Sequence, residues 1–257
     1  MKPKGKQCYY CGADASSREH VPPKLLFKSF NTSSITVPAC DAHNSSKSKA
    51  DQALVYALLI PLLNSQSQWP LTGNVRTAVR EAAPHLHEVK HTAYSAPLIS
   101  DAPNWGLPEV SYVMSKKLMM NWVRELTAGL IWDARKSRDP AIDWAQAVVF
   151  PIDWIDSQGG TPLSKKKVES ISIGKHLVQH EFNRLNWHQG WSAYPDPWPS
   201  DIYSFRVMVR PAEVAFHHRF YNQFNFYVIT SVSPETAACI AGKLLWYNSM
   251  KAKVVQP

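Results

Sequence analysis

The sequence predicts an α+β protein, in which a small metal-stapled module precedes a mostly helical domain with a small antiparallel sheet. Cysteine and histidine recur in two similar pairs within the first 43 residues. Apolar residues recur at helical spacing over residues 114–133, whereas residues 203–209 and 216–229 alternate apolar and polar residues as strands do. Each observation predicts one part of this architecture.

The composition changes along the chain, which predicts two domains. All ten tryptophans follow residue 68, and the first 50 residues carry eight Lys or Arg against three Asp or Glu. A unit this small and this poor in large apolar side chains buries too little surface to fold unaided, so a metal staple is physically reasonable. We therefore predict domains over residues 1–66 and 67–257. The second has no assigned role beyond recognition or regulation.

The N-terminal module contains three predicted elements. A short helix is expected within residues 21–27, after two prolines. A β segment is expected over residues 34–38, which include three consecutive β-branched residues. A helix follows over residues 45–60, and Pro61 ends it.

The larger domain is predicted to be mostly helical. Its clearest helix covers residues 114–133, where one face is continuously apolar. Residues 92–110 contain three prolines and a glycine and are predicted to form a loop. The other predicted elements are helices over 75–90, 166–185 and 233–246, and strands over 147–150, 203–209 and 216–229.

Two pairs of metal-binding side chains are each separated by two residues: Cys8 with Cys11, and Cys40 with His43. Three thiolates and one imidazole complete a closed tetrahedral zinc site, so this zinc is expected to be structural and not catalytic. Three of the four cysteines lie within the first 40 residues, which fits a metal site better than a disulfide framework. The fourth, Cys239, lies in an apolar segment and is expected to be buried.

A residue pair suited to acid–base chemistry lies between the two zinc half-sites. His20 has an ordinary pKa near neutrality, so it can take a proton from water. Glu19 beside it, and Asn44 just after the second half-site, offer oxygen ligands for a hard divalent cation. Such an ion would polarise a phosphodiester and stabilise the charge that develops during attack.

The order of these residues is as informative as their chemistry. The chain contains, in sequence, Cys8-x2-Cys11, Glu19-His20-Val21-Pro22-Pro23-Lys24, Thr36-Val37-Pro38-Ala39-Cys40 and His43-Asn44-x2-Lys47. This order resembles the HNH (ββα-metal) nuclease family in its zinc-containing treble-clef form. More narrowly, it looks like the stand-alone bacterial HNH proteins. The resemblance covers residues 8–51, about a fifth of the chain.

The resemblance implies a ββα module that cleaves nucleic acid with the help of a metal ion. His20 would be the general base that activates water, and Glu19 and Asn44 would bind or orient a Mg²⁺-like ion. Lys24 and Lys47 would contact phosphate. Zinc would be the structural cofactor, and magnesium or another divalent cation the catalytic one.

The chain departs from the family pattern at two positions. His43 stands where cysteine is usual, which imidazole chemistry accommodates. Ser33 and Ser34 stand where the family has an asparagine that helps to orient the base, and Asn31 is close but out of register. A less well oriented base would reduce cleavage by roughly tenfold or more.

Charge and composition limit the partners. The formal net charge is +8 and the isoelectric point is about 9.3, which favours a polyanion, with nucleic acid ahead of an acidic membrane surface. The expected partner is DNA, with RNA as an alternative, and a homodimer would let two sites act on two strands. We expect a cytoplasmic protein without a membrane partner, because no apolar run is long enough to span a bilayer.

Two other functions fit the same residues. The first is a non-catalytic zinc module that binds nucleic acid without cutting it, which the Ser33-Ser34 departure favours. The second is a regulated effector, in which the C-terminal domain senses a ligand or a partner and the nuclease is the output.

Overall fold

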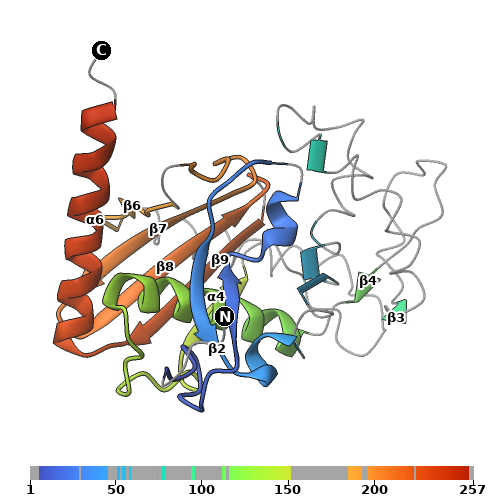
Figure 1. The fold of residues 1–257 in the computed structure, drawn as a ribbon, viewed down its shortest axis with the longest axis horizontal. Helices are drawn as coiled ribbons and strands as arrows, with labels where there is room; N and C mark the ends of the chain where they lie inside the picture. The colour runs from blue at the N-terminus through green and yellow to red at the C-terminus, as the bar shows by residue number, and fades with distance from the viewer. Residues whose placement is uncertain are drawn as a thin grey trace, which may run out of the picture.

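The computed structural model describes residues 6–28, 30–45, 51–52, 54–55, 58, 74, 77–78, 94–95, 112–113, 116–151, 185–192, 196–222 and 224–254. The described part mixes helices with antiparallel sheets, as predicted for an α+β protein (Figure 1). The helix predicted over 166–185 and most of the one predicted over 75–90 lie outside these ranges. The predicted loop over 92–110 contains the short strand β3 (Tyr94–Ser95), which pairs with β4 (Tyr112–Val113).

The N-terminal module is built on a two-stranded antiparallel hairpin. Strand β1 (Ser17–Val21) pairs with β2 (Ile35–Ala39), and the 3-10 helices η1 (Lys24–Phe27) and η2 (Asp41–His43) follow them in turn. The short helix and the β segment predicted here are confirmed. Strand β1 was not predicted, because its sequence Ser-Arg-Glu-His-Val holds one apolar residue in five. The residues of the predicted helix 45–60 that the structure describes from residue 51 onward are helical.

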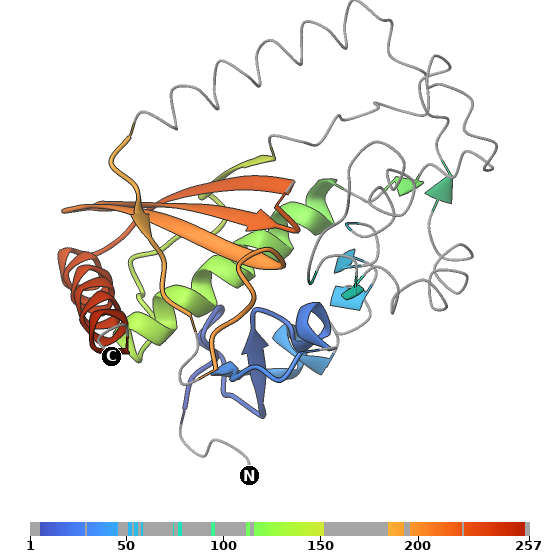
Figure 2. The same ribbon diagram turned by 90° about the horizontal axis from the view of Figure 1, so that it is seen from above.

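Helix α4 (Lys116–Arg135) confirms the helix predicted over 114–133, displaced by two residues. Figure 2 shows α4 lying between the β1–β2 hairpin and the large sheet. A helix in this position must be apolar on more than one side. Its buried residues accordingly lie all around the middle of the helix: Met119, Trp122, Val123, Leu126, Ala128, Leu130 and Ile131.

The large sheet has five antiparallel strands in the order β5-β9-β8-β7-β6. They are β5 (Val148–Pro151), β6 (His188–Gln189), β7 (Tyr203–Arg210), β8 (Glu213–Phe220) and β9 (Phe224–Ser231). The prediction of one strand over 216–229 was wrong, because the chain reverses at Tyr221 and Asn222. Both residues have positive φ, 51° and 58°, as in the tight turn of a hairpin.

Helix α6 (Pro234–Val254) begins as predicted but continues well beyond residue 246. The Ser233 side chain caps it by accepting a hydrogen bond from the Thr236 N–H at 3.2 Å. The helix packs against α4 and β7, and its buried apolar residues are Ala237, Ile240, Leu244 and Tyr247. Within the described residues, no helix combines the length and the apolar character needed to cross a membrane.

Buried side chains from both predicted domains belong to one contiguous apolar core, which runs from Cys8 and Tyr9 to Tyr247. The division at residue 66 falls outside the described residues and stays a prediction.

A buried histidine links α4 to the sheet in this core. The Thr127 hydroxyl donates its one proton to the Val123 carbonyl at 2.8 Å, so it must accept from His218 Nε2 at 2.9 Å. His218 Nδ1 then accepts from the Tyr203 hydroxyl at 2.9 Å. Both ring nitrogens of the neutral imidazole are satisfied, and burial lowers the pKa of His218 to about 3.

The protein should therefore become less stable as the pH falls, because His218 opposes protonation in the folded state. Its folded pKa lies below the unfolded value of about 6.5, so the unfolded chain binds the proton first as the pH falls. The contribution is complete above pH 6.5 and is lost towards pH 3, which amounts to about 2 kcal/mol between pH 7 and pH 5. The free energy of unfolding, measured with urea at pH 7 and pH 5, should therefore change less in His218→Gln than in the wild type, by about 2 kcal/mol. An equal loss in both proteins would contradict this account.

A glycine lets β1 approach α4 closely. A Cβ atom at Gly129 would lie 2.5 and 2.8 Å from the two methyl carbons of Val21. The strand that carries Glu19 and His20 is therefore seated directly on the helix backbone. At Gly242 of α6, by contrast, an added Cβ meets nothing within 4 Å.

These two glycines give opposite predictions for the same substitution. Gly242→Ala should stabilise the protein by up to about 1 kcal/mol, the usual gain of alanine over glycine in a helix. Gly129→Ala should destabilise it, because overpacking costs about 1–3 kcal/mol. Val21→Ala should relieve the clash, so a double-mutant cycle on unfolding free energies should give a favourable coupling. Additive single and double variants would show that the two residues do not touch in solution.

Candidate metal centre and the His20 site

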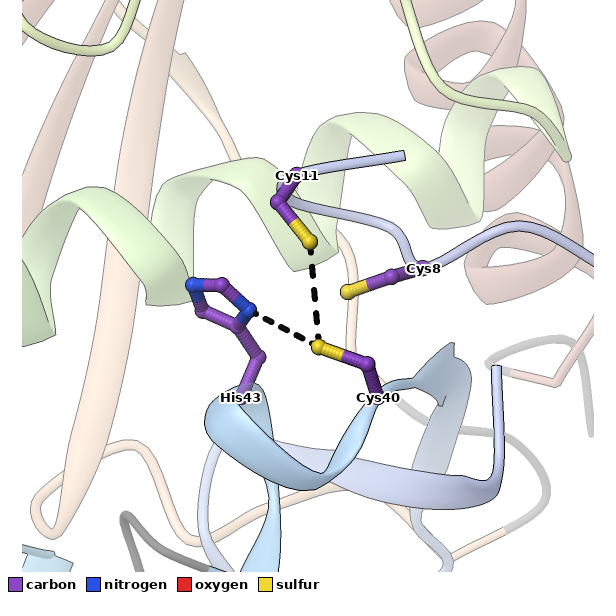
Figure 3. Close-up of side chains that lie close together, drawn as sticks. All are labelled: Cys8, Cys11, Cys40 and His43. Atoms are coloured by element: carbon purple, nitrogen blue, oxygen red, sulfur yellow. Dashed lines mark hydrogen bonds between the residues drawn. The ribbon is translucent and has the colours of Figure 1, made fainter. Parts of the chain in front are cut away.

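The four predicted zinc ligands come together. The Sγ atoms of Cys8, Cys11 and Cys40 and a ring nitrogen of His43 all lie within 4.8 Å of one another (Figure 3). Cys11 Sγ is 3.7 Å from Cys40 Sγ, and Cys40 Sγ is 3.2 Å from His43 Nδ1. A tetrahedral zinc ion with zinc–sulfur distances of about 2.3 Å would hold its sulfurs about 3.8 Å apart. The donor set and its spacing are thus consistent with a zinc site.

Two tight turns aim the ligands at one point. After the first pair, the Gly12 N–H donates to the Cys8 carbonyl at 3.1 Å, and Gly12 has a φ of 81°, which glycine adopts without strain. The Cys8 N–H donates to the Ala13 carbonyl at 2.7 Å. In the second pair, the His43 N–H donates to the Cys40 carbonyl at 3.1 Å across η2. Two residues between the ligands are what such turns require.

The electrostatics of the cluster favour a cation at its centre. Burial raises the pKa of the Cys8 thiol, but hydrogen bonds from His43 and from backbone N–H groups outweigh it and lower the value to about 6. The hydrogen bond to Cys8 raises the pKa of His43 to about 9. Burial and the neighbouring Cys8 charge raise the pKa of Cys11 to about 11. Ionisation of Cys8 therefore opposes ionisation of Cys11, and a divalent ion between them would remove this opposition.

The aromatic surroundings of the centre were not predicted. The Tyr10 ring lies between His43, at 4.8 Å between ring centroids, and Trp144, at 5.6 Å. Arg138 donates to the Tyr10 carbonyl at 3.1 Å, while Tyr9 is buried in the core. The only signal in the sequence was the presence of two tyrosines inside the Cys-x2-Cys pair.

Strand β1 turns Glu19 and His20 to opposite faces, as strand alternation requires. Glu19 is 5% exposed and faces the core, whereas His20 lies half-buried on the other face. His20 Nδ1 is buried without a hydrogen-bond partner. Burial, and the charge of Lys24, lower the pKa of His20, so the imidazole is neutral at neutral pH and can accept a proton.

Asn44 is held against β1 by its own side chain. Its amide nitrogen donates to the Ser17 hydroxyl at 2.7 Å and to the Arg18 carbonyl at 3.1 Å. These two bonds use both amide protons and leave Oδ1 as the acceptor atom of the group. Because Asn44 directly follows His43, the zinc half-site and the start of β1 are tied together next to Glu19 and His20.

The other predicted contacts are only partly described. Lys24 is exposed on η1, and Lys47 lies outside the described residues. Within the described part of the chain, Glu19 is not grouped with two further Asp, Glu, His or Cys side chains at metal-binding distance.

Comparison of the chain with protein-family models, with curated proteins and with solved structures finds no match. The interpretation of this site therefore depends on its own residues and their geometry.

We expect about one zinc ion per chain, as in closed four-ligand sites. Cys11→Ser and Cys40→Ser should abolish stoichiometric zinc, measured by elemental analysis, and lower the thermal unfolding midpoint. Cys239→Ser is the matched control, since Cys239 lies on α6 and is partly exposed, not buried as expected. Ligand variants that retain zinc like the control would exclude the site.

Proposed function

We propose that this protein is a metal-dependent endonuclease of the HNH type that hydrolyses phosphodiester bonds in DNA. The observation that carries the proposal is the state of His20: a neutral imidazole with a buried, unpartnered Nδ1, on a strand tied to the metal centre. A ring nitrogen without a partner is costly to bury, and such groups call for a functional explanation. The formal charge of +8 supports a polyanionic substrate.

In the proposed reaction, His20 removes a proton from a water molecule as its oxygen attacks phosphorus. The bond from phosphorus to the leaving sugar oxygen breaks, and that oxygen takes up a proton. A Mg²⁺-like ion bound by the oxygens of Glu19 and Asn44 would offset the negative charge that builds on the phosphate. Lys24 and Lys47 would hold neighbouring phosphates through charge alone.

Zinc has a positional role in this proposal. Its four ligands leave no open coordination position, so it would not activate water. It would instead hold η2 and thereby keep Asn44 against the Ser17–Arg18 end of β1.

One observation favours a second function, zinc-dependent binding of nucleic acid without cleavage. Glu19 is 5% exposed. Burial raises the pKa of the Tyr9 phenol, and the nearby charges of Glu125 and Glu19 raise it further. A carboxylate in this position would have a structural role in the core and would not bind a catalytic ion. The two functions differ in one observable, which is strand cleavage.

His20→Ala should reduce nicking of supercoiled plasmid DNA by at least about a hundredfold, the usual contribution of a general base. Wild-type cleavage should require Mg²⁺ or Mn²⁺ and stop with chelator, while zinc content and folding persist in the variant. His188→Ala, at an exposed histidine on β6, is the matched control.

Nicking at the wild-type rate by His20→Ala would eliminate this mechanism. Wild-type protein that shifts DNA in a gel but never nicks it, with any divalent ion, would establish the binding module instead.

A further inference from the structure

The connection between β1 and β2, residues 22–34, is held by a segment more than 160 positions later in the chain. The Ser33 N–H donates to the Asp196 carbonyl at 3.0 Å, and the Ser33 hydroxyl donates to Asp196 Oδ2 at 3.2 Å. The Trp198 indole N–H donates to the Ser33 carbonyl at 3.2 Å. The N–H, carbonyl and hydroxyl of one serine are therefore all bound to this segment. We call Ser33, Asp196 and Trp198 the latch.

Trp198 contacts both ends of the connection, near η1 and near β2. Its ring stacks on Phe27 of η1, with 5.9 Å between centroids and 10° between planes, while its N–H binds Ser33 just before β2. Both limbs of the connection thus meet one indole, which is 7% exposed. Figure 2 shows the segment before β7 descending from the sheet towards the N-terminal strands.

The Trp198 side of the latch packs against residues of the core. The backbone N–H of Trp198 donates to the Ser192 hydroxyl at 2.8 Å, and the Trp198 ring packs against Tyr203 with 5.6 Å between ring centroids. Tyr203 is fully buried and donates to His218, which contacts α4. A side chain anchored in this way cannot follow a movement of the connection without disturbing the sheet.

The latch acts at the end of the hairpin that carries His20. In the register of the two strands, Val21 pairs with Ile35 and His20 pairs with Thr36. Ser33 lies two positions before β2 begins, so fixing Ser33 fixes the connected end of the hairpin, one residue from His20.

We propose that Ser33, Asp196 and Trp198 are positioning residues for His20, so that the C-terminal half of the chain helps to build the nuclease site. This inference rests on the proposed nuclease function. On this view the C-terminal segment helps to form the site. In the regulated-effector alternative it would only restrain a site that is complete without it. Because the latch holds the base and not the substrate, its loss should lower kcat and leave the KM for DNA nearly unchanged.

The test compares Ser33→Ala with Ser34→Ala, a change at the exposed neighbour. Ser33→Ala and Trp198→Phe should lower kcat roughly ten- to a hundredfold, the effect of misplacing a catalytic group by about 1 Å. KM should stay within about twofold, since no phosphate contact is removed. Zinc content should be retained, Ser33→Thr should recover most of the rate because it keeps the hydroxyl, and Ser34→Ala should match wild type.

A second readout does not depend on cleavage. At fixed pH, the imidazole NMR signals of His20 should move in Ser33→Ala and not in Ser34→Ala, and the Ser33 amide should exchange faster with solvent. If wild-type protein never cuts DNA but these changes appear, the proposed function fails while the coupling of the latch to His20 stands. Unchanged kcat, His20 signals and amide exchange in both latch variants would overturn the inference.

Discussion

Three thiols and an imidazole placed within 4.8 Å of one another constitute the constraint on which the N-terminal module depends. Burial raises the pKa of Cys11, and the charge of Cys8 raises it further, so ionisation of one sulfur opposes ionisation of the other. A central cation converts that repulsion into four bonds. Those bonds would join the Cys8–Cys11 turn to η2, and Asn44 of the same segment is hydrogen-bonded to β1. A bound ion would thus help to position Glu19 and His20 without contacting either residue.

Helix α4 supplies what the metal centre lacks, namely apolar area. The module contributes few large side chains, and its hairpin is seated on α4 where Gly129 removes the side chain that would keep Val21 away. On its other side the same helix meets the sheet through the Thr127–His218–Tyr203 hydrogen bonds. The compositional break after the first 68 residues therefore marks a change in how the chain is stabilised, while the core itself runs through both parts.

Sequence reasoning succeeded where the chemistry is local. The four zinc ligands follow from two spacings, and α4 follows from its apolar period, because both signals lie within a few turns of chain. It failed where partners are distant or the local signal is ambiguous. Strand β1 is polar, and it forms because it pairs with β2 and buries Glu19 and Val21 on the side that faces the core. The β8–β9 turn uses Tyr221 and Asn222 without the glycine that usually marks it. The latch joins Ser33 to Asp196 and Trp198, a pairing that no periodicity could indicate.

The distribution of contacts bears on what the C-terminal half does. Contacts between the halves lie on the core-facing side of β1, where Val21 meets Gly129, and at the β1–β2 connection, where Trp198 meets Phe27 and Ser33. Others lie beside the Cys8–Cys11 turn, where Arg138 and Trp144 meet Tyr10. A restraint on the proposed nuclease would act on the side from which substrate would arrive, where His20 is half-buried and Lys24 is exposed. Contacts behind and beside His20 instead hold that residue in place. Separating the two halves would therefore disturb the position of His20. It would not release a nuclease that the C-terminal half had held inactive.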